Sequence, residues 1–273
     1  MTRHLHSRLA AAGYDVRKVT DLARGGEASV IRLELVDGRC VKLRQYPSPA
    51  AADRVWSALT LANGVTLPRP LIRLGNTMVT EYIEGKSLDR DLRRATPAAR
   101  RRFVRRAAQL AADLHRMSGT RGRPRLPTEH RQLITVVARR LGRRRLLDRG
   151  TVAALTGLTL PSAVRYVLTH GDLHPDNIVV EPSRHLRAVD EERIDRRPAA
   201  FELARIVMRW PLDAGLERAL LTAYDHAGGD SRHYRDHRTF WIAVALSTSA
   251  VYRLYYGLPG LRLVASELRR LVT

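Results

Sequence analysis

The early part of the chain, residues 16–45, alternates between hydrophobic and polar positions. Within it, residues 28–35 and 40–43 follow the two-residue period of strands, and the Asp37-Gly38 pair between them is typical of a hairpin turn. We therefore expect two antiparallel strands joined by a tight turn.

The pattern then changes from strand to helix. Pro49, at an early helical position, and Asn63, at the far end, delimit a predicted helix, and residues 77–83 form another predicted strand. From about residue 86 the hydrophobic residues recur with the 3.6-residue period of a helix, most clearly over 97–117. A strand-rich portion thus precedes a helical portion, which predicts an α+β fold with a cleft between two lobes.

The lobe boundary is expected near residue 85. Residues 1–84 are predicted to form an N-terminal lobe with an antiparallel sheet and one helix, and residues 85–273 a larger, mainly helical lobe. The total of 273 residues and a hydrophobic fraction of 44% suit a globular protein of this size.

No membrane segment is expected. The longest apolar candidate, 241–256, is interrupted by Arg253, and the N-terminus lacks the apolar stretch of a signal peptide. The single cysteine, Cys40, has no second cysteine with which to form an internal disulfide. These features predict a cytoplasmic protein without a membrane partner, and they leave its oligomeric state open.

The charge is strongly positive, with a net value of +21, and only three of the 48 basic residues are lysine. One interpretation is a polyanionic partner such as RNA. The other is a coding bias that replaces surface lysine with arginine. The excess is spread along the chain and aromatic residues make up only 5%, which favours the coding bias and leaves a nucleic-acid partner open.

The side chains that suggest chemistry gather in the segment His-Gly-Asp-Leu-His-Pro-Asp-Asn at 170–177 and again at Asp190. Phosphoryl transfer from ATP needs Mg²⁺, oxygen ligands to hold the ion, and a carboxylate to receive the proton of the acceptor hydroxyl. If the strands on either side of 181–187 pair as a hairpin, Asn177 and Asp190 come close together with Asp172 at the mouth.

This segment resembles the catalytic loop of the aminoglycoside phosphotransferase and choline kinase family, relatives of the protein kinases, which has the form His-x-Asp-x-x-x-x-Asn. The resemblance implies a bilobal protein-kinase-like fold, ATP and Mg²⁺ as cofactors, and a small-molecule hydroxyl as acceptor. It further implies that Asp172 is the catalytic base, that Asn177 and Asp190 are Mg²⁺ ligands, and that His170 is a structural member of the loop.

Other segments resemble the nucleotide site of the same family. The loop that contains Gly25, Gly26 and Ser29 resembles the family's glycine loop over the phosphates, and Lys42 fits the lysine that grips the α- and β-phosphates. The linker between the lobes, whose backbone would bind adenine, is represented by Glu81 and Ile83.

Two positions depart from the family pattern. The acid that braces the catalytic loop, normally Asp, is Glu202 here. The acid expected to pair with the phosphate lysine is normally a Glu on the first helix, and the only acid between Lys42 and Glu81 is Asp53. We therefore assign Asp53 to that pairing, with a favourable position in the first turns of its helix as the alternative.

The acceptor stays unidentified. The region after the catalytic loop carries several acids, diluted by Arg193, Arg196 and Arg197, so a sugar, nucleoside or antibiotic suits it at least as well as an aminoglycoside. These acids are Glu191, Glu192, Asp195, Asp213, Glu217, Asp225 and Asp230. A second reading is a kinase for RNA or peptide that docks on the Arg-rich segments 93–106 and 139–149. A third is a pseudokinase that binds nucleotide and serves as a scaffold.

Overall fold

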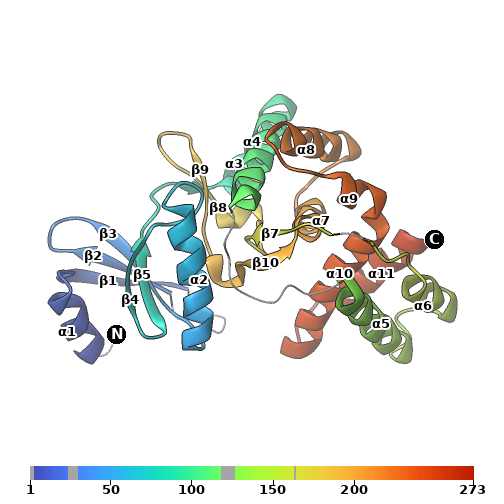
Figure 1. Cartoon of the computed structure of the whole chain (residues 1–273), viewed down its shortest axis with the longest axis horizontal. Coiled ribbons are helices and arrows are strands. Elements are labelled where there is room, and N and C mark those ends of the chain that lie inside the picture. The colour runs from blue at the N-terminus through green and yellow to red at the C-terminus, as the bar shows by residue number, and fades with distance from the viewer. Residues whose placement is uncertain (1–2, 24–29, 118–126, 163) are drawn as a thin grey trace.

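The computed structural model describes residues 3–23, 30–117, 127–162 and 164–273. Within them a sheet-containing lobe precedes a larger helical lobe, and Figure 1 shows the two side by side along the long axis. The α+β architecture expected from the pattern is therefore confirmed.

The N-terminal lobe is built on a five-stranded antiparallel sheet with the order β1-β2-β3-β5-β4. Its strands are β1 (Val16–Ala23), β2 (Val30–Leu35), β3 (Cys40–Gln45), β4 (Pro70–Leu74) and β5 (Thr77–Glu81). The Asp-Gly turn joins β2 to β3 as expected, with Gly38 at φ +86°.

Two helices flank this sheet. Helix α2 (Pro49–Ala62) begins at Ser48, whose side chain accepts a hydrogen bond from the Ala51 amide, and ends at Asn63 in the left-handed conformation. Helix α1 (Arg3–Ala11) precedes the sheet and was not expected from the sequence. Its Leu9 is fully buried in a small core with residues of β2, β3 and β5, so packing against the sheet stabilises this short helix.

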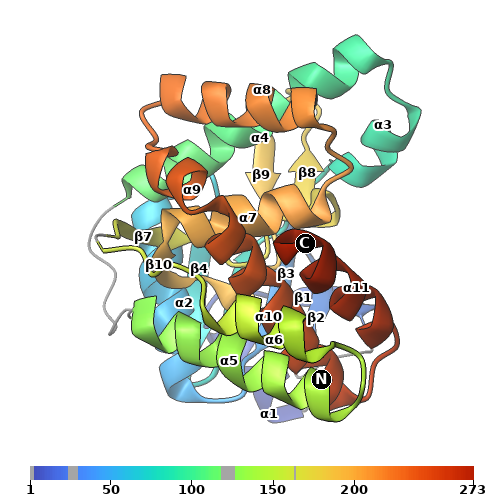
Figure 2. The same ribbon diagram turned by 90° about the vertical axis from the view of Figure 1, so that its right-hand side faces the viewer.

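The C-terminal lobe is mainly helical. Its first part contains β6 (Lys86–Ser87), α3 (Leu88–Arg94), α4 (Pro97–Arg116), α5 (Pro127–Arg143) and α6 (Arg149–Thr156). Its last part contains α7 (Ala199–Arg209), α8 (Ala214–His226), α9 (Arg232–Asp236), α10 (Arg238–Tyr256) and α11 (Leu261–Val272). Figure 2 shows α4 and α8 packed together on one side and α5, α6, α10 and α11 gathered on the other, with α7 between them.

Short strands carry the loops that face the N-terminal lobe. Strand β7 (Tyr166–Thr169) pairs with β10 (Asp195–Pro198), and β8 (Ile178–Val180) pairs with both β6 and β9 (Leu186–Ala188). Because β8 and β9 are antiparallel, the residues before β8 and after β9 lie at the same end of the hairpin.

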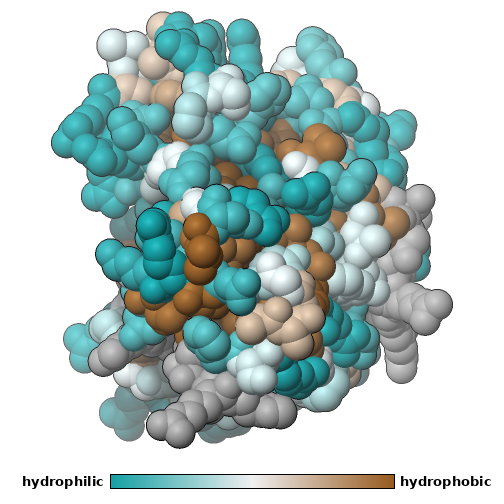
Figure 3. All heavy atoms as spheres, turned by 90° about the vertical axis from the view of Figure 1, so that its left-hand side faces the viewer, coloured by the Kyte–Doolittle hydropathy of each residue, from teal (hydrophilic) through white to brown (hydrophobic). Residues whose placement is uncertain are grey.

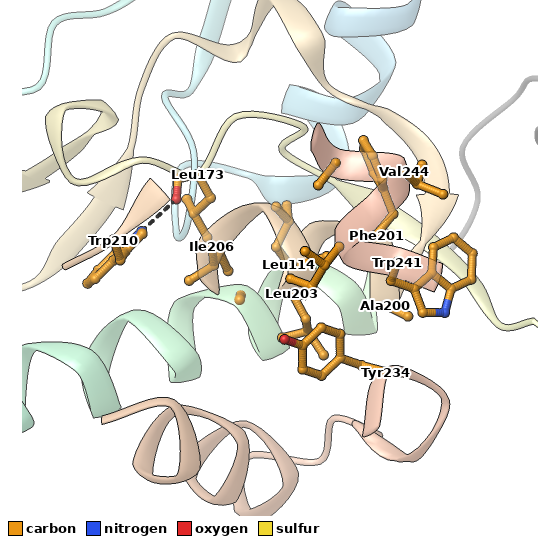
Figure 4. Packing of buried hydrophobic residues seen from close by; sticks show 14 of the residues in the cluster. Leu114, Leu173, Ala200, Phe201, Leu203, Ile206, Trp210, Tyr234, Trp241 and Val244 are labelled. Atoms are coloured by element: carbon orange, nitrogen blue, oxygen red, sulfur yellow. Dashed lines mark hydrogen bonds between the residues drawn. The ribbon is translucent and has the colours of Figure 1, made fainter. Parts of the chain in front are cut away.

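Helix α7 lies at the centre of the main hydrophobic core. Figure 4 shows Phe201, Leu203 and Ile206 packed among neighbouring elements, and all three are buried. Burial of side chains of this size contributes about 1.5–3 kcal/mol each. The helix is thus held firmly enough to position the loop above it.

The outer face of the N-terminal lobe is polar over much of its area. Figure 3 shows this side as largely hydrophilic, with hydrophobic residues surfacing in smaller groups between polar ones. Among the described residues, no helix combines the length and the apolar character needed to cross a membrane.

Candidate active site

A cleft of about 1750 Å³ runs between the two lobes. Residues of both lobes line it, and they include six of the nine expected site residues that the structure describes. Those described and lining the cleft are Lys42, Glu81, Ile83, Asp172, Asn177 and Asp190.

The loop 170–177, which was expected to be catalytic, lies between β7 and β8 and is held in place by a hydrogen bond from Trp210. The indole Nε1 of Trp210 donates a hydrogen bond to the Leu173 carbonyl at 2.9 Å, as drawn in Figure 4. Gly171 has φ +77°, and a Cβ at this position would collide with the backbone carbonyl of Arg193. Only glycine therefore suits the turn that presents Asp172.

Glu202, on α7, braces the same loop. Its carboxylate accepts hydrogen bonds from the Gly171 amide at 2.6 Å, from the His170 amide at 3.1 Å and from His115 Nε2 at 2.8 Å. Burial alone would raise the pKa of Glu202, but the hydrogen bond and charge of His115 outweigh it and lower that pKa. The longer acid thus spans the distance to two consecutive backbone amides.

His170 is fully buried beneath the cleft. Burial lowers the pKa of its imidazole, against the opposing effect of the Glu202 carboxylate. This environment favours a neutral ring that packs in the loop.

The β8–β9 hairpin brings Asn177 and Asp190 to the same end of the sheet. The Asn177 side-chain amide donates to the Asp172 carbonyl at 2.9 Å, and the Asn177 carbonyl accepts from the Val189 amide at 2.8 Å. Asp190 follows with φ +69°, a left-handed conformation that is uncommon for a non-glycine residue and typical of functional sites. Asp172, Asn177 and Asp190 therefore share one face of the cleft.

The oxygen atoms of Asn177 and Asp190 suit a hard cation such as Mg²⁺. Within the described ranges, no group of three or more His, Cys, Asp or Glu side chains is arranged to hold a metal ion. One carboxylate and one amide are nevertheless a sufficient donor set for Mg²⁺ if phosphate oxygens and waters complete its coordination. The residues present therefore fit a metal bound together with a nucleotide.

Arg44 approaches Asp190 from the N-terminal lobe. Its guanidinium pairs with the Asp190 carboxylate and lies 3.5 Å from that of Glu192. Arg44 is only 5% exposed, and the nearby Glu191 and Asp190 charges raise its pKa against the effect of burial. The Arg44 guanidinium therefore binds the Asp190 carboxylate, which was expected to bind a metal ion.

Lys42 pairs with Glu191, the residue after Asp190. The distance from Lys42 Nζ to Glu191 Oε2 is 2.8 Å, and the Tyr46 hydroxyl donates to Glu191 Oε1 at 3.3 Å. Burial favours the neutral acid, yet the charges of Lys42 and Arg44 prevail and lower the pKa of Glu191 to about 2. Lys42 is therefore held by the residue that directly follows Asp190.

The predicted pairing of Asp53 with Lys42 is wrong. Asp53 points away from the cleft on the exposed face of α2 and pairs with Arg73 of β4. The sequence places Asp53 on the expected helix, but that helix turns Ala52, Val55 and Leu59 into the core and leaves Asp53 at the surface. The role expected of Asp53 falls to Glu191.

Two arginines that sequence reasoning did not assign contact the Asp172 carboxylate. Arg205 Nη2 lies 2.7 Å from Asp172 Oδ1, and Arg209 contacts the same oxygen. Both follow Glu202 on α7 with helical spacings of three and seven residues, so all three share one helix face. That spacing is the signal by which they could have been found.

The remaining residues expected to bind the nucleotide are Glu81, Ile83 and the three residues of the glycine loop. Glu81 ends β5 and is held by the Arg187 guanidinium and by the Arg69 amide at 2.5 Å, while Ile83 lies two residues further along the linker. Gly25, Gly26 and Ser29 lie outside the described residues.

The arginines proposed for macromolecular docking lie elsewhere. Among the described residues that line the cleft, none comes from the segments 93–106 and 139–149. The arginines that do line it on the side of the helical lobe are Arg193, Arg205, Arg209 and Arg253.

Comparison with known proteins agrees with this arrangement. The sequence profile of the phosphotransferase enzyme family matches residues 18–239, which is most of the chain. No curated protein sequence matches it.

Several solved structures are similar over nearly the whole chain. A macrolide 2′-phosphotransferase type I is 18% identical with a TM-score of 0.70, and 98% of each chain is covered. The macrolide 2′-phosphotransferase MphH from Brachybacterium faecium is 21% identical with a TM-score of 0.68, covering 97% of this chain and 96% of that one. The choline kinase LicA from Streptococcus pneumoniae is 13% identical with a TM-score of 0.69, covering 99% and 98%. These likenesses confirm the kinase-like fold.

Proposed function

The chain belongs to the phosphotransferase enzyme family and acts on a hydroxyl group, and from this premise we propose that it moves the γ-phosphoryl group of ATP, with Mg²⁺, to a small-molecule alcohol. The observation that carries the proposal is the convergence of Asp172, Asn177 and Asp190 in one cleft that Lys42 enters from the opposite lobe. A carboxylate base, two oxygen ligands and a phosphate-binding cation are the groups that phosphoryl transfer needs.

The nucleotide half of the site is assigned to the N-terminal lobe. In this proposal Lys42, held in place by Glu191, binds the α- and β-phosphates, and the backbone at Glu81 and Ile83 receives the adenine. Gly25, Gly26 and Ser29 would cover the phosphates as the resemblance implies. Residues 1–84 would thus bind the nucleotide and residues 85–273 would carry the catalytic loop and the acceptor.

The metal ligands are assigned to the β8–β9 hairpin. Asn177 uses its amide nitrogen on the Asp172 carbonyl, so its amide oxygen is the atom that would face Mg²⁺ beside the Asp190 carboxylate. When bound, Mg²⁺ would neutralise phosphate charge. Arg44 would give up its contact with Asp190 at that stage and remain next to Glu192.

The transfer step is assigned to Asp172. Arg205 and Arg209 both contact its Oδ1, so Oδ2 is left to accept the hydroxyl proton. The acceptor oxygen forms a bond to the γ-phosphorus, the bond from that phosphorus to the bridging oxygen breaks, and ADP leaves. Positioning by Glu202 and Trp210 keeps the carboxylate aligned.

A transfer assay with γ-labelled ATP tests this function. Purified protein and Mg²⁺ would be offered sugars, nucleosides, antibiotics and tRNA, and labelled product would be identified by mass. We expect a labelled small molecule, and Asp172→Asn should lower turnover by about 10²–10⁴-fold while nucleotide binding persists. Asp176→Asn, in the same loop but exposed, is the matched control and should stay active.

The outcomes separate the three readings. Full activity of Asp172→Asn would exclude Asp172 as the catalytic base. Label transferred only to tRNA would favour a macromolecular kinase, and nucleotide binding without any transfer would favour a pseudokinase scaffold.

A further inference from the structure

The cleft extends past Asp172 into the helical lobe. We take this far end as the acceptor site, so the inference drawn from it rests on the proposed function. Its walls come from the end of α7, the second half of α10, the start of α11 and the loop 257–260. Lys42 and the linker between the lobes lie at the other end of the cleft.

The far end carries an excess of positive charge. Four arginines line it, namely Arg193, Arg205, Arg209 and Arg253. The acids beside them are already engaged: Asp172 contacts Arg205 and Arg209, and Glu267 pairs with Arg270 at 2.9 Å. Of the acids that the sequence offered for this region, only Glu192 lines the cleft, and it lies between Arg44 and Arg193.

The guanidinium groups also destabilise one another. Burial, aided by the charge of Arg193, lowers the pKa of Arg205 to about 10. Burial, aided by the charge of Arg253, likewise lowers the pKa of Arg209. Like charges held this close are stabilised by an added anion, which removes the repulsion and forms charge-assisted hydrogen bonds.

Arg253 lines the wall of the cleft, and the hydrogen-bonding capacity of its guanidinium is only partly used. Its Nη1 donates to Ser249 Oγ at 2.7 Å, whereas its Nε is buried and has no hydrogen-bond partner among the described residues. Gly260, at φ +89°, packs against this guanidinium, and a Cβ there would lie 3.1 Å from Nε. Ser249 and Gly260 thus fix the side chain, and because Arg253 lines the cleft, the part of its guanidinium beyond the covered Nε is the part that a ligand can reach.

The remaining surface of the far end is apolar and aromatic. The rings of Tyr252 and Tyr256 lie 4.6 Å apart between centroids, and the Arg193 guanidinium stacks over Tyr252 at 4.9 Å. Met208, Leu246 and Leu263 line the same region. A flat or apolar ligand body suits these side chains.

From this arrangement we propose that the acceptor is an anionic alcohol: a carboxylate or phosphate group held by Arg209 and Arg253, an apolar body against Tyr252 and Tyr256, and the hydroxyl directed at Asp172. A cationic acceptor would meet four guanidinium groups and gain no free carboxylate. The Arg209 contact then links recognition of the acceptor to the position of the Asp172 carboxylate.

Matched probes test the charge preference. The full-length protein, loaded with Mg²⁺ and a non-hydrolysable ATP analogue, would be titrated calorimetrically with 4-(hydroxymethyl)benzoate, 4-(hydroxymethyl)phenyl phosphate, 4-methylbenzyl alcohol and 4-(aminomethyl)benzyl alcohol. We expect at least one anionic probe to bind about 10-fold or more tightly than the neutral and cationic probes, since one charged hydrogen bond contributes about 1.5–3 kcal/mol. The carboxylate and phosphate arms distinguish the two anions.

Two arginine variants test whether the preference for anionic probes comes from the far end of the cleft. Arg253→Gln should remove the advantage of the anionic probe, and Arg218→Gln, an exposed arginine on α8, should keep it. The inference is overturned if the neutral or cationic probe binds as tightly, if no anion binds, or if Arg253→Gln keeps the preference. The proposed function has its own readout in the same experiment. Without binding of the Mg²⁺–nucleotide analogue the proposed function fails, whereas nucleotide binding with equal or tighter binding of the neutral or cationic alcohol defeats the charge preference alone.

Discussion

Lys42 and Glu191, which are 149 residues apart in the sequence, form a buried ion pair that joins β3 of one lobe to the segment after β9 of the other. Glu191 is fully buried and the Lys42 side chain is 11% exposed. One contact therefore fixes both the Lys42 ammonium group and the segment next to Asp190. A change in either partner is expected to affect both lobes.

Breaking this pair should cost stability and weaken nucleotide binding. Lys42→Met leaves the Glu191 carboxylate buried with the Arg44 charge and the Tyr46 hydroxyl as its remaining partners, and loss of one partner of a buried pair typically costs about 3–5 kcal/mol. Glu191→Gln should raise the KM for ATP because Lys42 is no longer held. We expect the free energy of unfolding, measured by denaturant titration of both single variants and the double variant, to give a coupling of about 2 kcal/mol or more.

The exposed pair of Arg17 and Glu34 is the matched control for that cycle. Its coupling should stay below about 1 kcal/mol, as for other surface pairs. Equal couplings at the two sites would mean that burial adds nothing to the Lys42–Glu191 contact.

The sequence predicted those parts of the structure that depend on neighbouring residues. Helix α2 begins after Ser48 and ends before Asn63 because a capping hydroxyl and a left-handed asparagine act locally. The hairpin before Asp190 could also be foreseen, and with it the approach of Asn177 to Asp190, because antiparallel pairing aligns the ends of both strands.

Features that depend on tertiary packing could not be predicted in this way. A one-dimensional pattern does not show which face of α2 is buried, so Asp53 was chosen where Glu191 is the partner of Lys42. The contact of Arg205 and Arg209 with Asp172 likewise requires the position of α7 under the loop. Helix α1 owes its place to Leu9 in the sheet core, and its short sequence carries no strong periodic signal.

Acid should destabilise the catalytic loop through Glu202. Because the folded pKa of Glu202 lies below its ordinary value of 4.5, its contribution to stability is present above that value and is lost as pH falls through the folded pKa. We expect the wild-type protein to lose more free energy of unfolding between pH 6 and pH 3 than Glu202→Gln does. Parallel pH profiles for the two proteins would show that the carboxylate contributes nothing as an ion.

Gly171→Ala should disrupt the turn that presents Asp172. The new Cβ would collide with the Arg193 carbonyl, and alanine would also have to adopt a positive φ. We therefore expect the free energy of unfolding to fall by about 3 kcal/mol or more and activity to be lost. Gly38→Ala is the matched control, since Gly38 also has a positive φ but nothing lies within 4 Å of its Cβ. Its cost should be only about 1–2 kcal/mol. Similar losses for both variants, measured by thermal or denaturant unfolding, would contradict the proposed clash.

Asp53→Asn separates the two candidate partners of the phosphate lysine. Asp53 is 61% exposed and pairs with Arg73 at the outer surface, so the variant should change the free energy of unfolding by less than about 0.5 kcal/mol. It should leave the KM for ATP as in the wild type, whereas Glu191→Gln should raise it, because Lys42 pairs with Glu191 and Asp53 pairs with Arg73. Initial rates measured against ATP concentration for both variants decide the question. If Asp53→Asn raised the KM and Glu191→Gln did not, Lys42 would have to exchange partners when the nucleotide binds, and the role inferred here for Glu191 would pass back to Asp53.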